Sequence, residues 1–466
     1  MRARMLCLAL VLGATACSSG SSGTTKKALN DDVSSLAYKG CTPDCTGTLE
    51  GAPYKVEMPT TWNGTLLLWS HGYRDAAASP PDFEAPDRLP DDAPDADSAK
   101  ALLAQGYALA GSAYASNGWA VQDGVKAGEQ LQAWFVQNVG KPRRTYVWGA
   151  SLGGLITELI NEKHPEWVSG AAPECGAVAG TTENLDGALA IAYLVKTLID
   201  PTLKITGYAS QQEAVAAFDK AQKSVIAAAG DVNGGGTAKV VAIATIARLA
   251  AQTKTYDGHD AVSGIKAKVE DILTAMGFAT FGQQEFATRV GGQGLDITGF
   301  DFAKNVTADD RALVGAYPKG DLDALVAELA KGVRPDVDPA ARAKAKEQGE
   351  TTGRISRPTI TLHDEQDPLV VPQNERVLGD RVFQAGQIGN LVQLFTKPPA
   401  TYSDAPYGAG HCTFTTTEQV GLITALDHWV RTGERATPAY AATVFAKPTG
   451  LDPSYYPAPF ALTATG

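Results

Sequence analysis

The amino-acid sequence predicts an α/β fold, in which a mostly parallel β-sheet is flanked by helices and carries a large helical insertion. Three observations predict this. Strand-like and helix-like stretches alternate up to about residue 180, mainly helical spacing follows up to about residue 354, and the alternation then returns. Such alternation is typical of parallel strands joined by helices. We therefore assign residues 29–180 and 355–466 to one sheet domain and residues 181–354 to the insertion.

The first part of the sheet domain contains the signals of five strands and three helices. Tyr54, Val56 and Met58 alternate along the first strand, and residues 66–69 form a continuous apolar run that is typical of a buried strand. The expected strands cover 46–59, 64–71, 107–113, 145–148 and 167–172, and the expected helices cover 95–105, 121–139 and 152–163.

In the insertion the hydrophobic period becomes helical, and breaks rich in Gly, Asn and Asp, such as residues 230–236, separate the helices. We expect helices at 185–199, 211–229, 239–253, 261–276, 322–330 and 339–348. The second part of the sheet domain then supplies strands at 359–363 and 390–396 and helices at 372–384 and 417–431. The last thirty or so residues show no clear period.

The N-terminal segment has the pattern of a bacterial export signal. Arg2 and Arg4 precede an apolar stretch over 5–13, which is too short to span a bilayer, and small residues lead up to Cys17. This arrangement resembles a lipobox, so we expect a signal peptide over 1–16, a lipid on Cys17 and a flexible tether over 17–28. An ordinary signal peptide, which would give a secreted protein, is the alternative. In either case we expect a soluble body that meets a membrane only through the anchor.

The charge of the chain excludes one class of partner. The formal net charge is −11, the isoelectric point is about 5.1 and no run of five Lys or Arg residues occurs. Binding to a nucleic-acid backbone needs clustered positive charge. We therefore do not expect nucleic acid as a partner.

The cysteines predict disulfide bonds. Two of the six lie in the N-terminal segment, and an even number in the rest of an exported chain favours disulfides. Cys41 and Cys45 flank a short turn that could close locally, which leaves Cys175 and Cys412 for each other. No cluster has the spacing of zinc ligands, so we expect neither a metal nor a cofactor.

A G-x-S-x-G motif at 149–153 contains the candidate nucleophile. It lies between an expected strand and an expected helix, where a sharp turn would lift the Ser151 hydroxyl above the sheet. Such a turn leaves room only for small residues, which explains Gly149 and Gly153. Ser151 is therefore the candidate nucleophile, and it needs a base and an acid.

The candidate base is His411. The other five histidines lie at strand or helix ends, within the last helix or in the insertion, whereas His411 lies in a glycine-containing loop between the last strand and the last helix. The candidate acid is Asp367, in the turn after the preceding strand, with Asp364 as the alternative. The order nucleophile, acid, base differs from the orders found in chymotrypsin and subtilisin.

Two backbone amides are candidates for an oxyanion hole. One donor should come from the residue after the nucleophile, which is Leu152, and the other from the loop after the expected strand at 64–71. Residues 70–73 (Ser-His-Gly-Tyr) supply that loop, in which Gly72 would let the chain bend toward the substrate and Tyr73 would donate its N–H.

With these motifs the sequence resembles the α/β-hydrolase superfamily over about residues 40–180 and 355–435. More narrowly, segments 54–65, 116–124 and 409–414 resemble exported bacterial serine hydrolases. The resemblance implies acyl transfer through an acyl-enzyme, on esters or on peptides. Tannase and feruloyl esterase relatives join the Ser and His loops through a cysteine next to each residue. Here Cys412 follows His411 but Ala150 precedes Ser151, so a Cys175–Cys412 bond would be an analogue.

The sequence therefore predicts an extracytoplasmic serine esterase that acts on a small-molecule or polymeric ester, with the insertion as a cap over its site. A serine exopeptidase is the first alternative, and it would need an acidic group to capture a free amine, for which Glu174 and Glu158 are candidates. The second alternative is a lipoprotein that uses the fold as a non-catalytic binding module.

Overall fold

The computed structural model describes residues 34–42, 44–76, 88–249, 261–397, 411–445 and 450–460. The expected signal peptide over 1–16, the tether over 17–28 and the lipidation site Cys17 lie outside the described residues.

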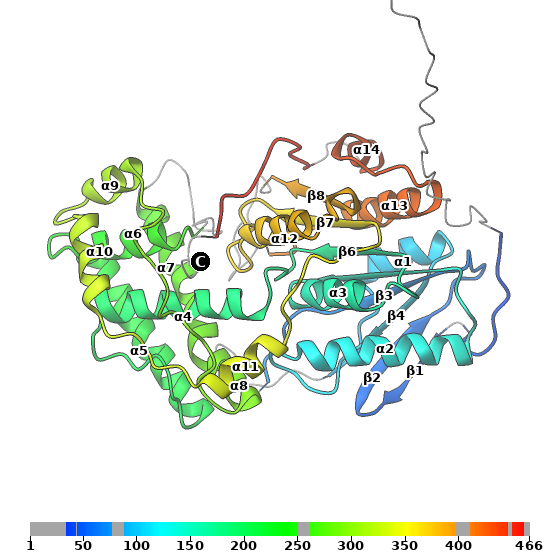
Figure 1. The fold of residues 1–466 in the computed structure, drawn as a ribbon, viewed down its shortest axis with the longest axis horizontal. Helices are drawn as coiled ribbons and strands as arrows, with labels where there is room; N and C mark the ends of the chain where they lie inside the picture. The colour runs from blue at the N-terminus through cyan, green and yellow to red at the C-terminus, as the bar shows by residue number, and fades with distance from the viewer. Residues whose placement is uncertain are drawn as a thin grey trace, which may run out of the picture.

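An eight-stranded sheet forms the centre of the fold (Figure 1), in the order β1-β2-β4-β3-β5-β6-β7-β8. The pairings β1–β2 and β2–β4 are antiparallel, and all the others are parallel. This arrangement confirms the predicted fold class, a mostly parallel sheet of the α/β-hydrolase type. The strands are β1 (Asp44–Leu49), β2 (Ala52–Glu57), β3 (Thr65–Ser70), β4 (Ala108–Ser112), β5 (Arg144–Ala150), β6 (Gly170–Glu174), β7 (Thr359–Asp364) and β8 (Leu391–Thr396).

Helices cover both faces of the sheet, which explains the continuous apolar run in β3. Leu66 and Leu68 face a core that includes residues of α2 and α3, whereas Leu67 and Trp69 face a second core shared with α1 and α13. A central strand that is buried on both faces has no solvent-facing positions to fill with polar residues. The flanking helices are α1 (Ala96–Ala104), α2 (Val121–Asn138), α3 (Leu152–Lys163), α12 (Gln373–Gln384), α13 (Thr416–Thr432) and α14 (Pro438–Val444).

A helical segment lies between β6 and β7, and Figure 1 shows it gathered beside one end of the sheet. Helix α4 runs through it and contacts α7, α10, α11 and a π-helical turn. Its elements are α4 (Thr181–Leu198), α5 (Gln211–Gly230), α6 (Gly236–Ile246), α7 (Ala261–Gly277), η1 (Phe278–Gly282), α8 (Gln283–Val290), α9 (Ala308–Gly315), α10 (Leu322–Lys331) and α11 (Pro339–Glu347).

The structure differs from the sequence prediction at several elements. The first expected strand, 46–59, is a hairpin of β1 and β2, because Glu50 and Gly51 both have positive φ angles and form a tight turn. Helices α8, α9 and α14 were not expected, since each has only seven or eight residues and shows little more than two turns of periodicity. Helix α6 ends at Ile246, before the expected 253.

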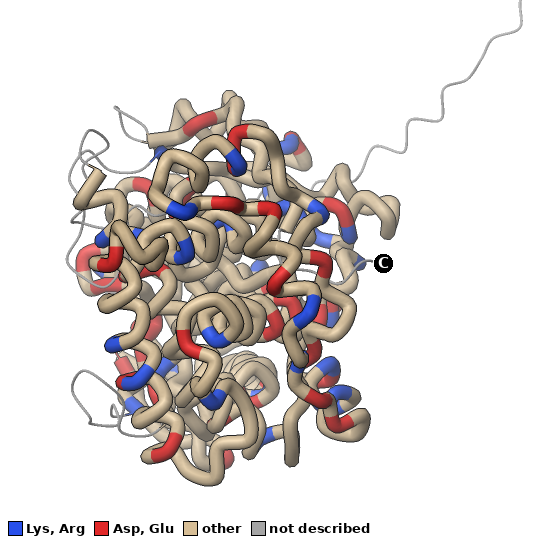
Figure 2. Tube along the Cα trace, turned by 90° about the vertical axis from the view of Figure 1, so that its left-hand side faces the viewer, with Lys and Arg blue, Asp and Glu red and all other residues tan. Residues whose placement is uncertain are grey.

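Charged residues of both signs are interspersed along the helical segment in the view of Figure 2. Among the described residues, no helix combines the length and the apolar character needed to cross a membrane.

Candidate active site

Ser151 occupies a strained turn between β5 and α3. Its φ and ψ angles are 60° and −122°, a conformation that residues with a side chain rarely adopt. The chain packs tightly around this turn. A Cβ on Gly149 would lie 2.5 Å from the Ser70 carbonyl oxygen, and one on Gly153 would overlap the same oxygen. Both motif glycines are therefore required by the close approach of β3, as the G-x-S-x-G pattern predicts.

Ser151, His411 and Asp367 form one hydrogen-bonded chain. The Nε2 atom of His411 lies 2.8 Å from Ser151 Oγ, and its Nδ1 atom lies 2.7 Å from Asp367 Oδ2. Asp367 is fully buried, and its second oxygen accepts the backbone N–H groups of Leu369 and Val370 at 2.9 and 3.0 Å. The structure thus brings together the three residues that the sequence proposed as nucleophile, base and acid.

Asp364, the alternative acid, has a different setting. It ends β7, and its Oδ1 atom accepts the backbone N–H of Gln366 at 2.7 Å. Burial raises the pKa of Asp364 to about 7, and the neighbouring Asp367 charge adds to that rise. Asp367, by contrast, is the carboxylate that lies against Nδ1 of His411.

We predict that Asp364→Asn changes kcat for ester hydrolysis by less than about fivefold, because its carboxylate supports a turn and does not orient the imidazole. Steady-state kinetics of this variant beside Asp367→Asn measure the difference. A larger loss in Asp364→Asn than in Asp367→Asn would overturn our choice of the acid.

The two expected oxyanion donors lie beside the nucleophile. Gly72, Tyr73 and Leu152 line the same cavity as Ser151, and a Cβ on Gly72 would lie only 3.3 Å from Ser151 Cβ. Among the described residues the backbone N–H groups of Tyr73 and Leu152 have no hydrogen-bond partner. Free donors beside the nucleophile are what an oxyanion hole requires.

A second histidine, which sequence reasoning assigned no role, lies behind Asp367. His363 Nε2 is 3.7 Å from Asp367 Oδ2 and 2.7 Å from the Val370 carbonyl, and its Nδ1 is 3.3 Å from Glu375 Oε1. Burial alone would lower the pKa of His363, but Glu375 and Asp367 outweigh it and raise the pKa. The ring therefore links the acid turn to α12. The sequence signal that could have identified this residue is a histidine at a strand end, four residues before Asp367.

Both expected disulfides are present. Cys175 and Cys412 are bonded with a Cα–Cα distance of 5.5 Å, and Cys41 and Cys45 with one of 5.0 Å. Cys412 follows His411 directly, and its Sγ lies 3.5 Å from His411 Nε2. Like Ser151, both Cys175 and Cys412 have positive φ angles. Backbone strain of this kind tends to gather at functional sites, where the surrounding structure holds it in place.

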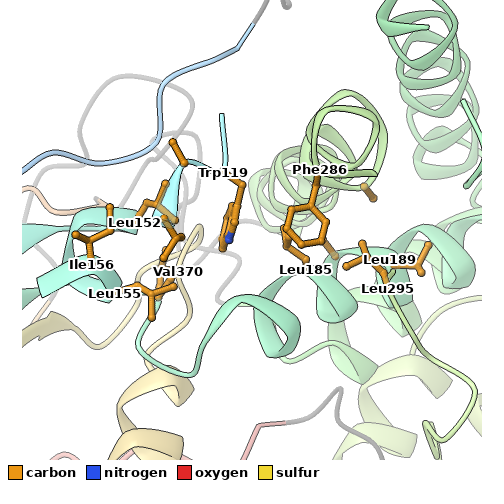
Figure 3. Close-up of a cluster of buried hydrophobic side chains, with 14 of the residues drawn as sticks. Trp119, Leu152, Leu155, Ile156, Leu185, Leu189, Phe286, Leu295 and Val370 are labelled. Carbon is orange, nitrogen blue, oxygen red and sulfur yellow. The ribbon is translucent and has the colours of Figure 1, made fainter. Parts of the chain in front are cut away.

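A cavity of about 350 Å³ opens beside Ser151. Residues after β3, β5, β6 and β7 form its floor, and helices α4 and α7 with η1 form its opposite wall. The apolar part of the lining includes Trp119, Leu185, Ala188, Ile191, Ala275 and Phe278. None of the described residues that line it is Asp, Glu, Lys or Arg. Figure 3 shows Trp119 between Leu152 of α3 and Leu185 of α4.

Glu174 and Glu158, the candidate amine-binding residues, do not line this cavity. Both are fully buried elsewhere, Glu174 at the end of β6 and Glu158 within α3. Burial raises the pKa of Glu174 to about 8 and that of Glu158 well above its usual range. Neither carboxylate is placed to bind the amine of a substrate at Ser151.

The raised pKa of Glu174 predicts a pH-dependent stability. The neutral Glu174 carboxyl contributes to the free energy of unfolding. This contribution is fully present below the ordinary pKa of about 4.5 and is lost as the pH rises through about 8, because the folded state then holds a buried charge. We expect the stability of Glu174→Gln relative to the wild type to rise by about 4 kcal/mol as the pH is raised from 5 to 9. Urea unfolding at both pH values measures this.

The control for that prediction is Glu328→Gln, on an exposed position of α10. The control should follow the wild-type pH profile. Parallel profiles for Glu174→Gln and the wild type would show that Glu174 titrates normally in the folded protein.

The fold and the site together define an α/β-hydrolase architecture with a serine, a histidine and an aspartate aligned at its nucleophile turn. No family model and no curated protein matches the chain. Among solved structures, it is similar to proline iminopeptidase of Mycobacterium smegmatis, with 12% identity, a TM-score of 0.36 and coverage of 84% of this chain and 99% of that one.

Two esterases are similar to the same extent. An esterase from Aspergillus oryzae has 14% identity and a TM-score of 0.39, with 84% of this chain and 80% of that chain covered. The cell-wall-degrading esterase LipA of Xanthomonas oryzae has 13% identity and a TM-score of 0.38, with 82% and 87% covered. The fold assignment rests on the strand order of this chain.

Proposed function

We propose that the protein is a serine hydrolase that cleaves carboxylic esters through an acyl-enzyme. The observation that carries the proposal is the hydrogen-bonded chain from Ser151 through His411 to Asp367, which begins at a strained turn between β5 and α3. A serine hydroxyl becomes nucleophilic when an adjacent base accepts its proton and a buried carboxylate orients that base.

The geometry supports the following sequence of steps. His411 Nε2 takes the proton of Ser151 while Oγ attacks the ester carbonyl, and the N–H groups of Tyr73 and Leu152 stabilise the oxyanion. Protonated His411, held by Asp367, then gives its proton to the leaving alcohol. Water, activated by the same imidazole, hydrolyses the acyl-enzyme and releases the acid.

The uncharged lining of the cavity favours esters over an exopeptidase substrate. An exopeptidase that acts at a free N-terminus needs an acidic group near the reacting carbonyl to pair with the ammonium group. The described residues that line the cavity supply no carboxylate, and both glutamates considered for that role are buried outside it.

A fluorophosphonate probe and paired substrates test the proposal. We expect the probe to label Ser151, and p-nitrophenyl esters to be cleaved at least about 100-fold more efficiently than aminoacyl p-nitroanilides. Faster cleavage of the anilides would favour the exopeptidase. No labelling, together with no turnover, would favour a non-catalytic binding protein.

We further propose that the protein works outside the cytoplasm, anchored to a bacterial membrane through a lipid on Cys17. Two disulfides support an oxidising compartment, and the residues up to Cys17 support processing as a lipoprotein. The native protein should partition into detergent, and Cys17→Ser should not. Mass spectrometry of an unmodified N-terminus at another residue would indicate a secreted protein instead.

A further inference from the structure

We propose that the substrate is an ester of an uncharged, apolar acid, and that the cavity between the sheet domain and the helical segment binds its acyl group. This inference rests on the proposed hydrolase function and adds the substrate class to it. The cavity contains Ser151 and His411, and most of its other lining side chains are apolar or aromatic.

The chemistry of the tetrahedral intermediate decides which end of the ester enters the cavity. The carbon attacked by Ser151 carries an oxyanion, which lies at the amides of Tyr73 and Leu152, and a leaving oxygen, which must lie at His411 Nε2 to receive its proton. The acyl chain is the remaining substituent and points away from His411. Tyr73, whose amide is one of the two oxyanion donors, also contributes its ring to an aromatic wall of the cavity, and we place the acyl chain against that wall.

Three aromatic side chains from separate parts of the chain make this wall. Phe278 of η1 meets Tyr73 edge to face with ring centroids 5.2 Å apart, and Trp119 lies 6.5 Å from each of them. Small residues, Gly187 and Ala188 of α4 and Ala275 of α7, leave the space between the wall and the helices open. An aliphatic or aromatic acyl group suits a space of this kind.

Hydrogen bonds hold the wall in place. The Trp119 indole N–H donates to Thr181 Oγ1 at 2.9 Å, and its backbone N–H donates to Glu285 Oε2 at 3.0 Å. Arg289 binds Glu285 at 2.6 Å and the Asn117 carbonyl at 2.9 Å. The loop 116–119 is therefore fixed to α4 and α8, so that the cavity is largely formed before the substrate arrives.

The absence of charge among the described lining residues excludes charged acyl groups. A carboxylate or an ammonium group that enters an apolar site without a partner loses its hydration and gains nothing in return. An added methylene, by contrast, contributes about 0.8 kcal/mol when it is buried, which corresponds to about fourfold in kcat/KM.

The first experiment compares p-nitrophenyl esters from acetate to octanoate. We expect kcat/KM of the wild type to rise about fourfold per methylene until the cavity is filled. Ala275→Phe, which fills the cavity, should reduce the octanoate-to-acetate ratio at least about 20-fold. Ala227→Phe, at an exposed position of α5 outside the cavity, is the matched control and should keep the wild-type ratio.

A second variant keeps the test valid if the first one misfolds, and a second probe tests the effect of charge on the acyl group. Phe278→Ala, which enlarges the cavity, should shift the preference to longer acyl groups even if Ala275→Phe fails to fold. The p-nitrophenyl ester of 6-aminohexanoate, which matches heptanoate in length but carries an ammonium group, should be cleaved at least about 100-fold less efficiently than the heptanoate.

The outcomes separate the two proposals. Labelling of Ser151 by a fluorophosphonate, combined with a wild-type preference for acetate, overturns the acyl site and keeps the hydrolase. Equal rates for the charged and neutral esters also overturn the acyl site, and so does an equal loss on all esters in an Ala275→Phe variant whose circular dichroism is native. Absence of both labelling and turnover overturns the proposed hydrolase function itself.

Discussion

Ser151→Ala and His411→Ala are each expected to lower kcat for ester hydrolysis by at least about 10³-fold while the fold is retained. The first removes the attacking oxygen, and the second removes the group that lies 2.8 Å from it and would take its proton. Neither change leaves a sealed void inside a core, since Ser151 and His411 both line the open cavity. Circular dichroism checks the fold, and p-nitrophenyl ester kinetics measure the loss.

Asp367→Asn should also be severe, because an amide in that place can donate a hydrogen bond to Nδ1 and so favour the wrong tautomer of His411. The double variant Ser151→Ala with His411→Ala should be little worse than either single variant, since the residues act as one unit. Near-additive losses would indicate that they act separately. Normal turnover in any one of the single variants with an intact fold would contradict the proposed mechanism.

The nucleophile turn could be predicted from sequence because local sterics determine it. Gly149 and Gly153 are required by the Ser70 carbonyl, which approaches from β3 in any arrangement where β3 lies beside β5. The proximity of Asp367 and His411 to Ser151 could be predicted because the carboxyl ends of parallel strands meet at one edge of the sheet, and because both residues follow strands that come later in the chain.

The surroundings of Asp367 could not be predicted. They depend on side-chain contacts between separate helices and strands, and the local sequence does not show how these elements pack. His363 appeared to be only a strand-end histidine, and its contact with Glu375 depends on how α12 packs on β7. The cavity wall is a similar case. Trp119 and Phe278 are 159 positions apart, and nothing in their local sequence shows that η1 packs against the loop before α2.

The interior of the helical segment was also only partly predictable. Helix α4 is buried around nearly its whole circumference, and its apolar pattern gives a clear signal. The short helix α9 depends instead on contacts such as the capping box of Thr307 with Asp310 and the pairing of Arg248 with Asp310. Capping residues define a helix end, but a two-turn helix has too few apolar positions to show a period.

Loss of the Cys175–Cys412 disulfide is expected to produce the largest change in stability among the variants considered. The bond closes a segment of 237 residues that contains the entire helical segment. In the chain-entropy model a loop this long stabilises the folded protein by about 5.5 kcal/mol relative to the open chain. The Cys41–Cys45 bond closes a segment of only 4 residues, so the same model gives it about 2 kcal/mol.

Loss of the Cys175–Cys412 disulfide should lower activity under conditions in which the protein is still folded. Cys412 is the residue after His411, and Cys175 follows β6, whose last residue accepts the backbone N–H of Ser151 at 3.0 Å. The bond therefore ties the imidazole to the strand beside the nucleophile. Without it, His411 keeps its contacts to Ser151 and Asp367 but loses the covalent restraint on its loop, so that the reactive geometry is occupied less often.

Cys175→Ser with Cys412→Ser tests both consequences, and Cys41→Ser with Cys45→Ser is the matched control. In the first double variant we expect kcat/KM to fall at least about tenfold at temperatures where circular dichroism is still native, and the urea midpoint to fall well below that of the control. Titration with a reductant should reproduce the order, with activity lost before the fold. Two results would contradict the structural role: free thiols at 175 and 412 in peptide maps of exported protein, or equal unfolding midpoints in the two double variants. Equal activity with and without reductant, in protein whose bond is shown to be reduced, would restrict the disulfide to stability and show that the hydrogen bonds to Ser151 and Asp367 suffice to place His411.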